Sequence, residues 1–396
     1  MKHAQTGETG MAPEDILPEE LLERLRSRAA GYDQENRFFH EDLQDLADAG
    51  YLKVFVPEAD GGRGLGLEAV AELQRRLATA APATALAVNM HLVWTGVAHA
   101  MSARGDDSLD FVLKDAGQGE IFAFGISEAG NDSMLFDSGT VARPLPDGSY
   151  SFTGRKIFTS LSRGWTRLGT FGKDADARNG EGELVFGFLR RDEPGHETLD
   201  DWNTLGMRAS ASNTTLLTDA VIPAERIFRK LPVGPNKDLL IFAIFACFET
   251  LLAAVYTGLA ERAFALAVDN VKRRVSAKYG GRSFAQDPDI RWKIADAAMA
   301  MDGMLPQLSA ITRDVDRMVD HGPQWFPKLV GLKSRATENA RYVVDLAIRV
   351  SGGSSYFRGS ELERLYRDVL AGIFHPSNDE SAHNTVASAW LGPLEA

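Results

Sequence analysis

The sequence predicts a three-part fold: an N-terminal all-α domain, a central β domain built as a barrel or sandwich, and a C-terminal four-helix bundle. Three observations support it. At 396 residues, the chain is too long for a single core. Apolar residues recur at spacings of three and four in residues 21–120 and 236–396, which is the helical period. Residues 121–235 instead contain short runs that alternate apolar and polar side chains, as β-strands do.

The first helical region follows a polar lead-in. Residues 1–20 begin without an apolar core, so we expect them to be disordered and not to form a secretory signal. Further on, Leu43, Leu46 and Ala47 form an apolar stripe, and Gly50 follows as a helix stop. These features place a packed helical domain between residues 21 and 120.

The central region has the turns and alternation of an antiparallel β structure. Residues 141–144 lead into a turn at 146–149, and the alternating segment 150–153 follows, which predicts a hairpin. Residues 184–189 and 215–222 are further strand candidates. We therefore expect a small antiparallel barrel or sandwich.

The helical period returns after residue 236 and continues to the C-terminus. Glycine-containing breaks at 280–281, 322–323 and 352–353 divide it into long helices with short connections, typical of a bundle. The stretch 239–260 is apolar enough to imitate a membrane span, but Glu249 lies in its middle. A carboxylate is costly in hydrocarbon, so we expect a buried bundle helix and no membrane association.

Composition limits the possible partners. The net charge of −12 argues against nucleic acid, which needs a basic surface. The single cysteine, Cys247, excludes an intrachain disulfide and a multi-cysteine metal site, and we expect no metal. A reducing cytoplasm fits this cysteine usage.

Four segments carry a resemblance to a known family. They are residues 124–130 (FGISEAG), 154–160 (GRKIFTS), 205–212 (LGMRASAS) and 349–353 (RVSGG). In this order they resemble the acyl-CoA dehydrogenase superfamily, and the resemblance runs from about residue 25 to 392. It implies the family fold and a flavin cofactor, FAD or FMN.

The resemblance also implies which residues meet the flavin ring. Ile126 and Ser127 would contact its pyrimidine end, Phe158 would pack on the ring, and Ser160 would lie by the reactive N5 edge. Side chains two positions apart on a strand point the same way, so Phe158 and Ser160 can approach one planar ligand together.

Further cofactor contacts are implied in the bundle by Arg274, Arg349, Gly353 and Ser377. In the family, the position of Arg274 reaches the cofactor pyrophosphate across a subunit interface, and the glycine turn approaches the adenylate end. These contacts imply a homodimer, commonly paired into a homotetramer.

The most informative departure from the family is His375. It stands where the best-known members carry a catalytic glutamate, so an imidazole replaces the carboxylate base. Pro376 biases His375 away from helical angles, which places the imidazole where the last helix breaks. In this fold that break opens toward the flavin. An unperturbed histidine pKa near 6.5 would also suit a base.

Three residues are candidates for substrate binding: Ser133, Arg208 and Glu249. Arg208 could hold a phosphate or carboxylate, or pair with an acidic residue. Glu249 is also a reserve base, because some family members carry their glutamate on an earlier bundle helix. That position aligns with Phe248, and one residue is about 100° around a helix.

Three functions stay open at this point. A monooxygenase using reduced flavin and oxygen, with a separate flavin reductase, would use His91, Ser160 and His375 as hydrogen-bond groups on a small organic substrate. An acyl-CoA dehydrogenase would use His375 or Glu249 as base and pass electrons to an electron-transfer flavoprotein. A catalytically inactive binder of flavin or acyl-CoA is the third alternative, and the monooxygenase is preferred.

Overall fold

The computed structural model describes residues 13–394. Its N-terminal domain is helical, and the helices are α1 (Pro13–Ile16), α2 (Glu19–Glu35), α3 (His40–Asp48), α4 (Leu67–Ala78), α5 (Pro82–Ser102) and α6 (Asp110–Gly117). Of the predicted lead-in, residues 1–12 lie outside the described part. The prediction of disorder is wrong for residues 13–20, because α1 and the start of α2 bury Ile16 and Leu17 in the core.

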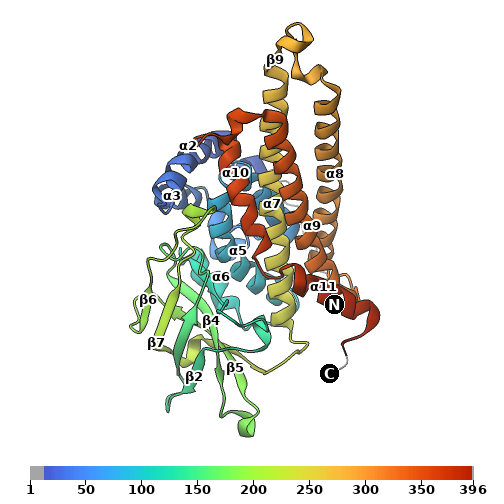
Figure 1. The fold of residues 1–396 in the computed structure, drawn as a ribbon. Coiled ribbons are helices and arrows are strands. Elements are labelled where there is room, and N and C mark those ends of the chain that lie inside the picture. The colour runs from blue at the N-terminus through green and yellow to red at the C-terminus, as the bar shows by residue number, and fades with distance from the viewer. Residues whose placement is uncertain (1–12, 395–396) are drawn as a thin grey trace.

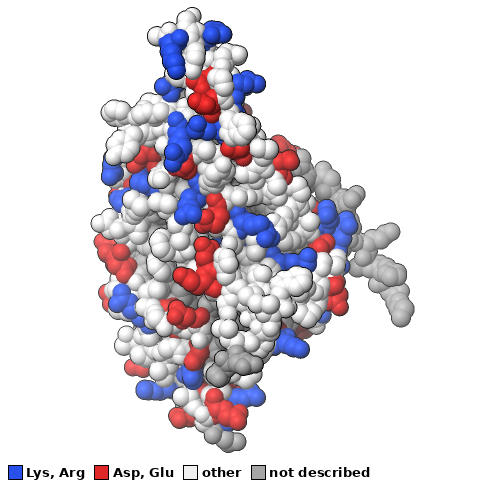
Figure 2. Space-filling model, turned by 45° about the vertical axis from the view of Figure 1, so that its right-hand side comes forward, with Lys and Arg blue, Asp and Glu red and all other residues white. Residues whose placement is uncertain are grey.

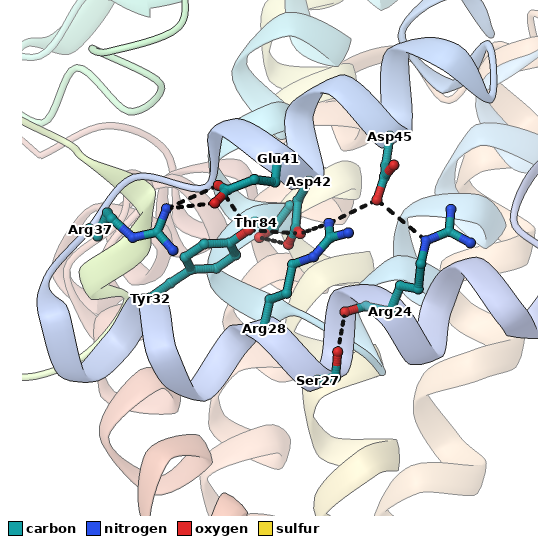
Figure 3. A network of polar contacts seen from close by, with 9 residues as sticks. All are labelled: Arg24, Ser27, Arg28, Tyr32, Arg37, Glu41, Asp42, Asp45 and Thr84. Carbon is teal, nitrogen blue, oxygen red and sulfur yellow. Dashed lines mark hydrogen bonds and ion pairs between the residues drawn. The ribbon is translucent and has the colours of Figure 1, made fainter.

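A polar network joins α2 and α3 to the start of α5 (Figure 3). The fully buried Asp42 accepts hydrogen bonds from Arg28 at 2.9 Å, from the Tyr32 hydroxyl at 3.1 Å and from the Thr84 hydroxyl at 3.4 Å. Burial raises the pKa of Asp42 to about 6, although these donors favour the ionised form. The network fixes α5, whose Leu86 and Met90 line the cavity described below.

The central domain is one eight-stranded sheet. Its strands are β1 (Phe122–Gly125), β2 (Val141–Pro144), β3 (Tyr150–Lys156), β4 (Arg167–Asp174), β5 (Glu183–Arg190), β6 (His196–Thr198), β7 (Thr215–Ile222) and β8 (Ile227–Pro232). They lie in the order β6-β7-β3-β2-β4-β5-β8, and β1 pairs with β4. The β2–β3 hairpin is confirmed. A wholly antiparallel sheet is wrong, because β1 and β2 pair with β4 in parallel.

The C-terminal bundle consists of α7 (Leu239–Arg273), α8 (Pro288–Asp316), α9 (Trp325–Ser351), α10 (Glu361–Val369) and α11 (Asp379–Leu391). The hairpin of β9 (Val275–Ser276) and β10 (Arg282–Ser283) joins α7 to α8. Within the described residues, α7 alone is long and apolar enough to cross a membrane. The most apolar part of α7 is 83% buried inside the protein, which confirms the predicted core helix.

The β domain lies against one end of the bundle, and α5 packs between the two (Figure 1). The predicted order of helical domain, sheet and helical bundle is confirmed. Acidic and basic side chains are interspersed on the face shown in Figure 2. Where the β domain meets the bundle, residues of these two parts that are far apart in the sequence come together.

Candidate functional site

Two adjoining hollows, of about 270 Å³ and about 660 Å³, lie where the β domain meets the bundle. We call them together the junction cavity. The residues common to both hollows are Phe124, Ser127, Phe158, Phe248, Phe374 and Pro376. Four of these six are phenylalanines, so the wall that the two hollows share is mostly apolar. Such a surface suits a planar aromatic ligand or an apolar substrate.

The β domain contributes Phe158 and Ser160 to this cavity. Strand β3 ends at Lys156, so both residues lie in the following loop and not on the strand as predicted. The loop is attached by the Ile157 amide, which donates to the Ser127 carbonyl at 2.9 Å. Phe158 is 55% exposed and meets the edge of Trp202 at 6.2 Å between ring centroids. An exposed aromatic face in a concave site is free to stack on a ligand.

A chain of serine hydroxyls supports this wall. The Ser160 hydroxyl lies 2.7 Å from that of Ser212, which in turn lies 2.7 Å from that of Ser210. Because a hydroxyl both donates and accepts, Ser160 can present either a proton or a lone pair to a ligand. Ser160 and Ser212 line the smaller hollow, and the place of Ser160 at the N5 edge of a flavin stays a prediction.

The loop after β1 is shaped by a buried ion pair. Lys156 donates to Glu128 at 2.5 Å, and Glu128 also accepts from the Thr140 hydroxyl and the Gly139 amide. Burial alone would raise the pKa of Glu128, but Lys156 and these donors outweigh it and lower the pKa to about 2. The fixed carboxylate holds Ile126 and Ser127 at the cavity wall. The predicted substrate residue Ser133 is exposed and is not among the lining residues.

His375 lies beyond the last turn of α10, as predicted, and lines the smaller hollow. Its Nε2 is 2.8 Å from the hydroxyl of Tyr256 on α7. Burial, followed by the charge of Lys333, lowers the pKa of His375 to about 3, so the imidazole is neutral at physiological pH.

The tautomer of His375 follows from its partner. Tyr256 is fully buried, and within residues 13–394 its hydroxyl has no other hydrogen-bond partner. The O–H therefore donates to Nε2, because otherwise a buried donor would be left unsatisfied. Nε2 is thus an acceptor, and the ring proton resides on Nδ1. His375 is a neutral hydrogen-bond donor through Nδ1 and not a base at that atom.

Glu249 lines the larger hollow and is 2% exposed. Its Oε1 accepts from the Ser377 amide at 3.1 Å and from the Ser377 hydroxyl at 2.9 Å, while Oε2 has no partner among the described residues. Burial raises the pKa of Glu249 to about 7, against the opposing charge of Lys333. Ser377 is itself buried and bonded to Glu249, so its hydroxyl faces the protein and not the cavity.

Two predicted residues lie away from the cavity. His91 is fully buried: its Nε2 is 2.6 Å from the Leu52 carbonyl, and its Nδ1 accepts from the Phe122 amide. Both nitrogens are occupied, so the structure does not support a catalytic role for His91. Arg208 donates to the backbone carbonyls of Asp33 and Thr204. In this conformation it therefore links two segments of the protein and is not a substrate ligand.

The remaining cofactor candidates lie at the far end of the bundle. Arg274 donates to the carbonyl of Ser351 and Arg349 pairs with Asp345, close to Gly353. Arg274 directly follows the last residue of α7 and lies 25 positions after Glu249, which is about 37 Å at roughly 1.5 Å per residue. These residues therefore do not share a site with the cavity of their own chain.

Sequence reasoning missed two residues of the site, Tyr256 and Lys333. Tyr256 lies in the long apolar stretch of α7, where nothing distinguishes it from a core residue. Lys333 lies within the apolar stripe of α9, next to Leu329 and Leu332, and a lysine on a buried face is a usable signal.

Comparison with known proteins gives matches over most of the chain. Residues 18–107 match the acyl-CoA dehydrogenase N-terminal domain, and residues 250–380 match the C-terminal domain of the same family. YdbM of Bacillus subtilis, provisionally named an acyl-CoA dehydrogenase, is 28% identical over 93% of this chain and 94% of its own. L-evernosamine nitrososynthase of a Micromonospora species is 29% identical over 89% and 84%, respectively. Dibenzothiophene monooxygenase of Mycolicibacterium goodii is 24% identical over 90% and 88%.

Solved structures share the whole fold. A nitrososynthase from Micromonospora carbonacea superposes with a TM-score of 0.83 at 25% identity, over 98% of both chains. KijD3, solved with FMN and a dTDP-linked amino-keto sugar, gives a TM-score of 0.86 at 25% identity, over 99% of this chain and 96% of that one.

Proposed function

Since the chain belongs to the acyl-CoA dehydrogenase superfamily and is a flavin-dependent oxidoreductase, we propose that it is a monooxygenase that uses reduced flavin and oxygen on a small organic substrate. Relatives with nitrososynthase and monooxygenase names support this branch of the family.

The junction cavity fits a flavin. Phe158 offers an exposed aromatic face, and Ser127 and Ser160 offer polar groups on an otherwise apolar wall. We propose that these three residues, with the backbone at Ile126, hold the ring. A bound, reduced flavin supplies two electrons to O2, so that one oxygen atom enters the substrate and the other leaves as water.

One observation carries the proposal: His375 is held as a neutral donor. A base that removes an α-proton needs a pKa near the working pH, and a value of about 3 is far below it. Oxygen chemistry instead needs a donor that stabilises developing negative charge on oxygen, which Nδ1–H can supply. The tyrosine that fixes Nε2 also fixes the direction of that donor.

The test begins without oxygen. The purified protein is reconstituted with FAD or FMN, and acyl-CoA thioesters are added while the visible absorbance of the flavin is followed. The proposal expects no bleaching by any thioester. It then expects oxygen-dependent product formation once the flavin is reduced chemically or by a flavin reductase; bleaching by a thioester under anaerobic conditions would refute it.

Acyl-CoA dehydrogenation is the second candidate, and Glu249 favours it. This carboxylate lines the cavity with a pKa of about 7, a suitable value for a base. Its Oε1 is already bound to Ser377, so only Oε2 is open to this role. Loss of thioester bleaching in Glu249→Gln, but not in His375→Asn, would establish this alternative.

We also propose that a second copy of the chain completes the cofactor site. Arg274, Arg349 and Gly353 lie too far along the bundle to reach a flavin in their own cavity. They could meet the flavin of a partner in a homodimer or homotetramer. Light scattering with and without FAD tests this, and a monomeric holoprotein would contradict it. Association with a flavin reductase and a cytoplasmic location stay predictions.

A further inference from the structure

The loop that carries His375 depends on one side chain for three hydrogen bonds. Lys333 Nζ donates to the carbonyls of Gly372 at 3.1 Å, His375 at 2.8 Å and Ser377 at 2.9 Å. An ammonium group has three N–H donors, so Lys333 is saturated by these carbonyls alone. The loop lies between α10 and α11 and includes Pro376, which has no N–H to donate.

A buried carboxylate acts on the same loop from the opposite helix. Glu249 on α7 accepts from the amide and hydroxyl of Ser377, while Lys333 lies on α9. Lys333 is 1% exposed and Glu249 is 2% exposed. Each charge influences the other, since Lys333 opposes the upward shift of the Glu249 pKa and Glu249 opposes the downward shift of the Lys333 pKa.

A gain in folding stability does not explain why Lys333 and Glu249 are both buried. Burying two charges costs several kcal/mol each, and well-packed apolar residues in their place are often as stable or more so. What apolar residues cannot do is fix three carbonyl oxygens at defined points. The pair therefore has a geometric consequence: the backbone of His375 is held by Lys333, and its ring is held by Tyr256.

We infer that Lys333 is a positioning residue of the active site: its ammonium holds the 372–377 loop, opposite Glu249, so that His375 stays at the cavity wall with its Nε2 against Tyr256. The inference deepens the proposed function, since it explains how the His375 donor is placed. It also assigns Glu249 a structural role beside that of a reserve base.

The test compares holoprotein variants. Lys333→Met removes all three donors, Lys333→Arg keeps the charge with altered geometry, and Lys328→Met changes an exposed lysine of the same helix as the control. The pKa of His375 is measured by NMR titration of the imidazole signals, with His375→Asn identifying its resonance among the eight histidines. Oxygen-dependent turnover is measured in parallel, with kcat separated from KM.

Lys333→Met is expected to raise the pKa of His375 by at least one unit and to lower kcat at least about tenfold, with KM changed less. Lys333→Arg should recover part of both, and Lys328→Met should match the wild type. If Lys333→Met does not fold, Lys333→Arg is measured alone and should still differ from the wild type in the His375 titration and in kcat, because a guanidinium cannot place three donors at the positions of the ammonium. An unchanged His375 titration and kcat in a folded Lys333→Met would overturn the inference. A shifted titration in a protein with no oxygen-dependent activity would leave the positioning role standing and refute the proposed function.

Discussion

Glu249→Gln should remove part of the pH dependence of the free energy of unfolding. In the wild type, burial raises the pKa of Glu249 from 4.5 to about 7, so the folded state favours the protonated carboxyl. The resulting stabilisation is fully present below pH 4.5 and is lost as the pH rises through about 7. A shift of this size corresponds to about 3 kcal/mol at roughly 1.4 kcal/mol per pKa unit. Glutamine does not titrate, yet its oxygen can still accept from Ser377.

The assay is urea unfolding of both proteins at several pH values between 5 and 8.5. The free energy of unfolding of Glu249→Gln, relative to wild type, should rise by about 2–3 kcal/mol across this range. The substitution can also change the packing around Glu249 and so shift the stability of the variant by the same amount at every pH, so the slope is the test and not the offset. Parallel pH profiles for the two proteins would refute the placement of Glu249 as a buried carboxyl.

Three further predictions concern the donor and the flavin wall. His375→Asn should lower oxygen-dependent turnover by about 10²–10³-fold, as loss of an oxyanion donor does, with flavin affinity nearly unchanged; product assays and flavin fluorescence measure the two. Tyr256→Phe should destabilise the protein by about 1 kcal/mol in urea unfolding, since one buried hydrogen bond is lost, whereas Tyr342→Phe at an exposed site of α9 should not. Ser160→Ala should weaken flavin binding several-fold, as measured by fluorescence titration, because the hydroxyl that is bonded to Ser212 and lines the cavity is lost. An unchanged flavin affinity would show that the flavin does not contact Ser160.

Much of the fold could be predicted from the sequence, because the patterns that predict helices and strands are periodic and lie within single elements. The alternation in β7 follows from the geometry of one strand, and the burial of α7 follows from its apolar composition. Pro376 correctly placed His375 beyond a helix end. The mixed sheet was missed, because pairing of β1 with β4 joins segments about 45 residues apart and leaves no mark on either strand.

The site could be predicted only in part, because its residues come from elements that are far apart in the sequence. Phe158 and Ser160 both line the cavity, while their contact with a flavin ring stays a prediction. His91 does not, because a turn of about 100° per residue sends its neighbour Met90 to the cavity and His91 into the core. The contact between Tyr256 and His375 spans 119 positions, so no local pattern predicts it.

The most direct test of the proposed monooxygenase activity is to measure whether an oxygen atom of O2 enters the product. The holoprotein is supplied with reduced flavin, ¹⁸O2 and a panel of small amines and aromatic compounds, and the products are analysed by mass spectrometry. We expect a product that carries one oxygen-18 atom from O2 and that His375→Asn forms about 10²–10³-fold more slowly. Conversion of an acyl thioester to its enoyl product without oxygen, with no labelled product from any compound, would contradict the proposed activity.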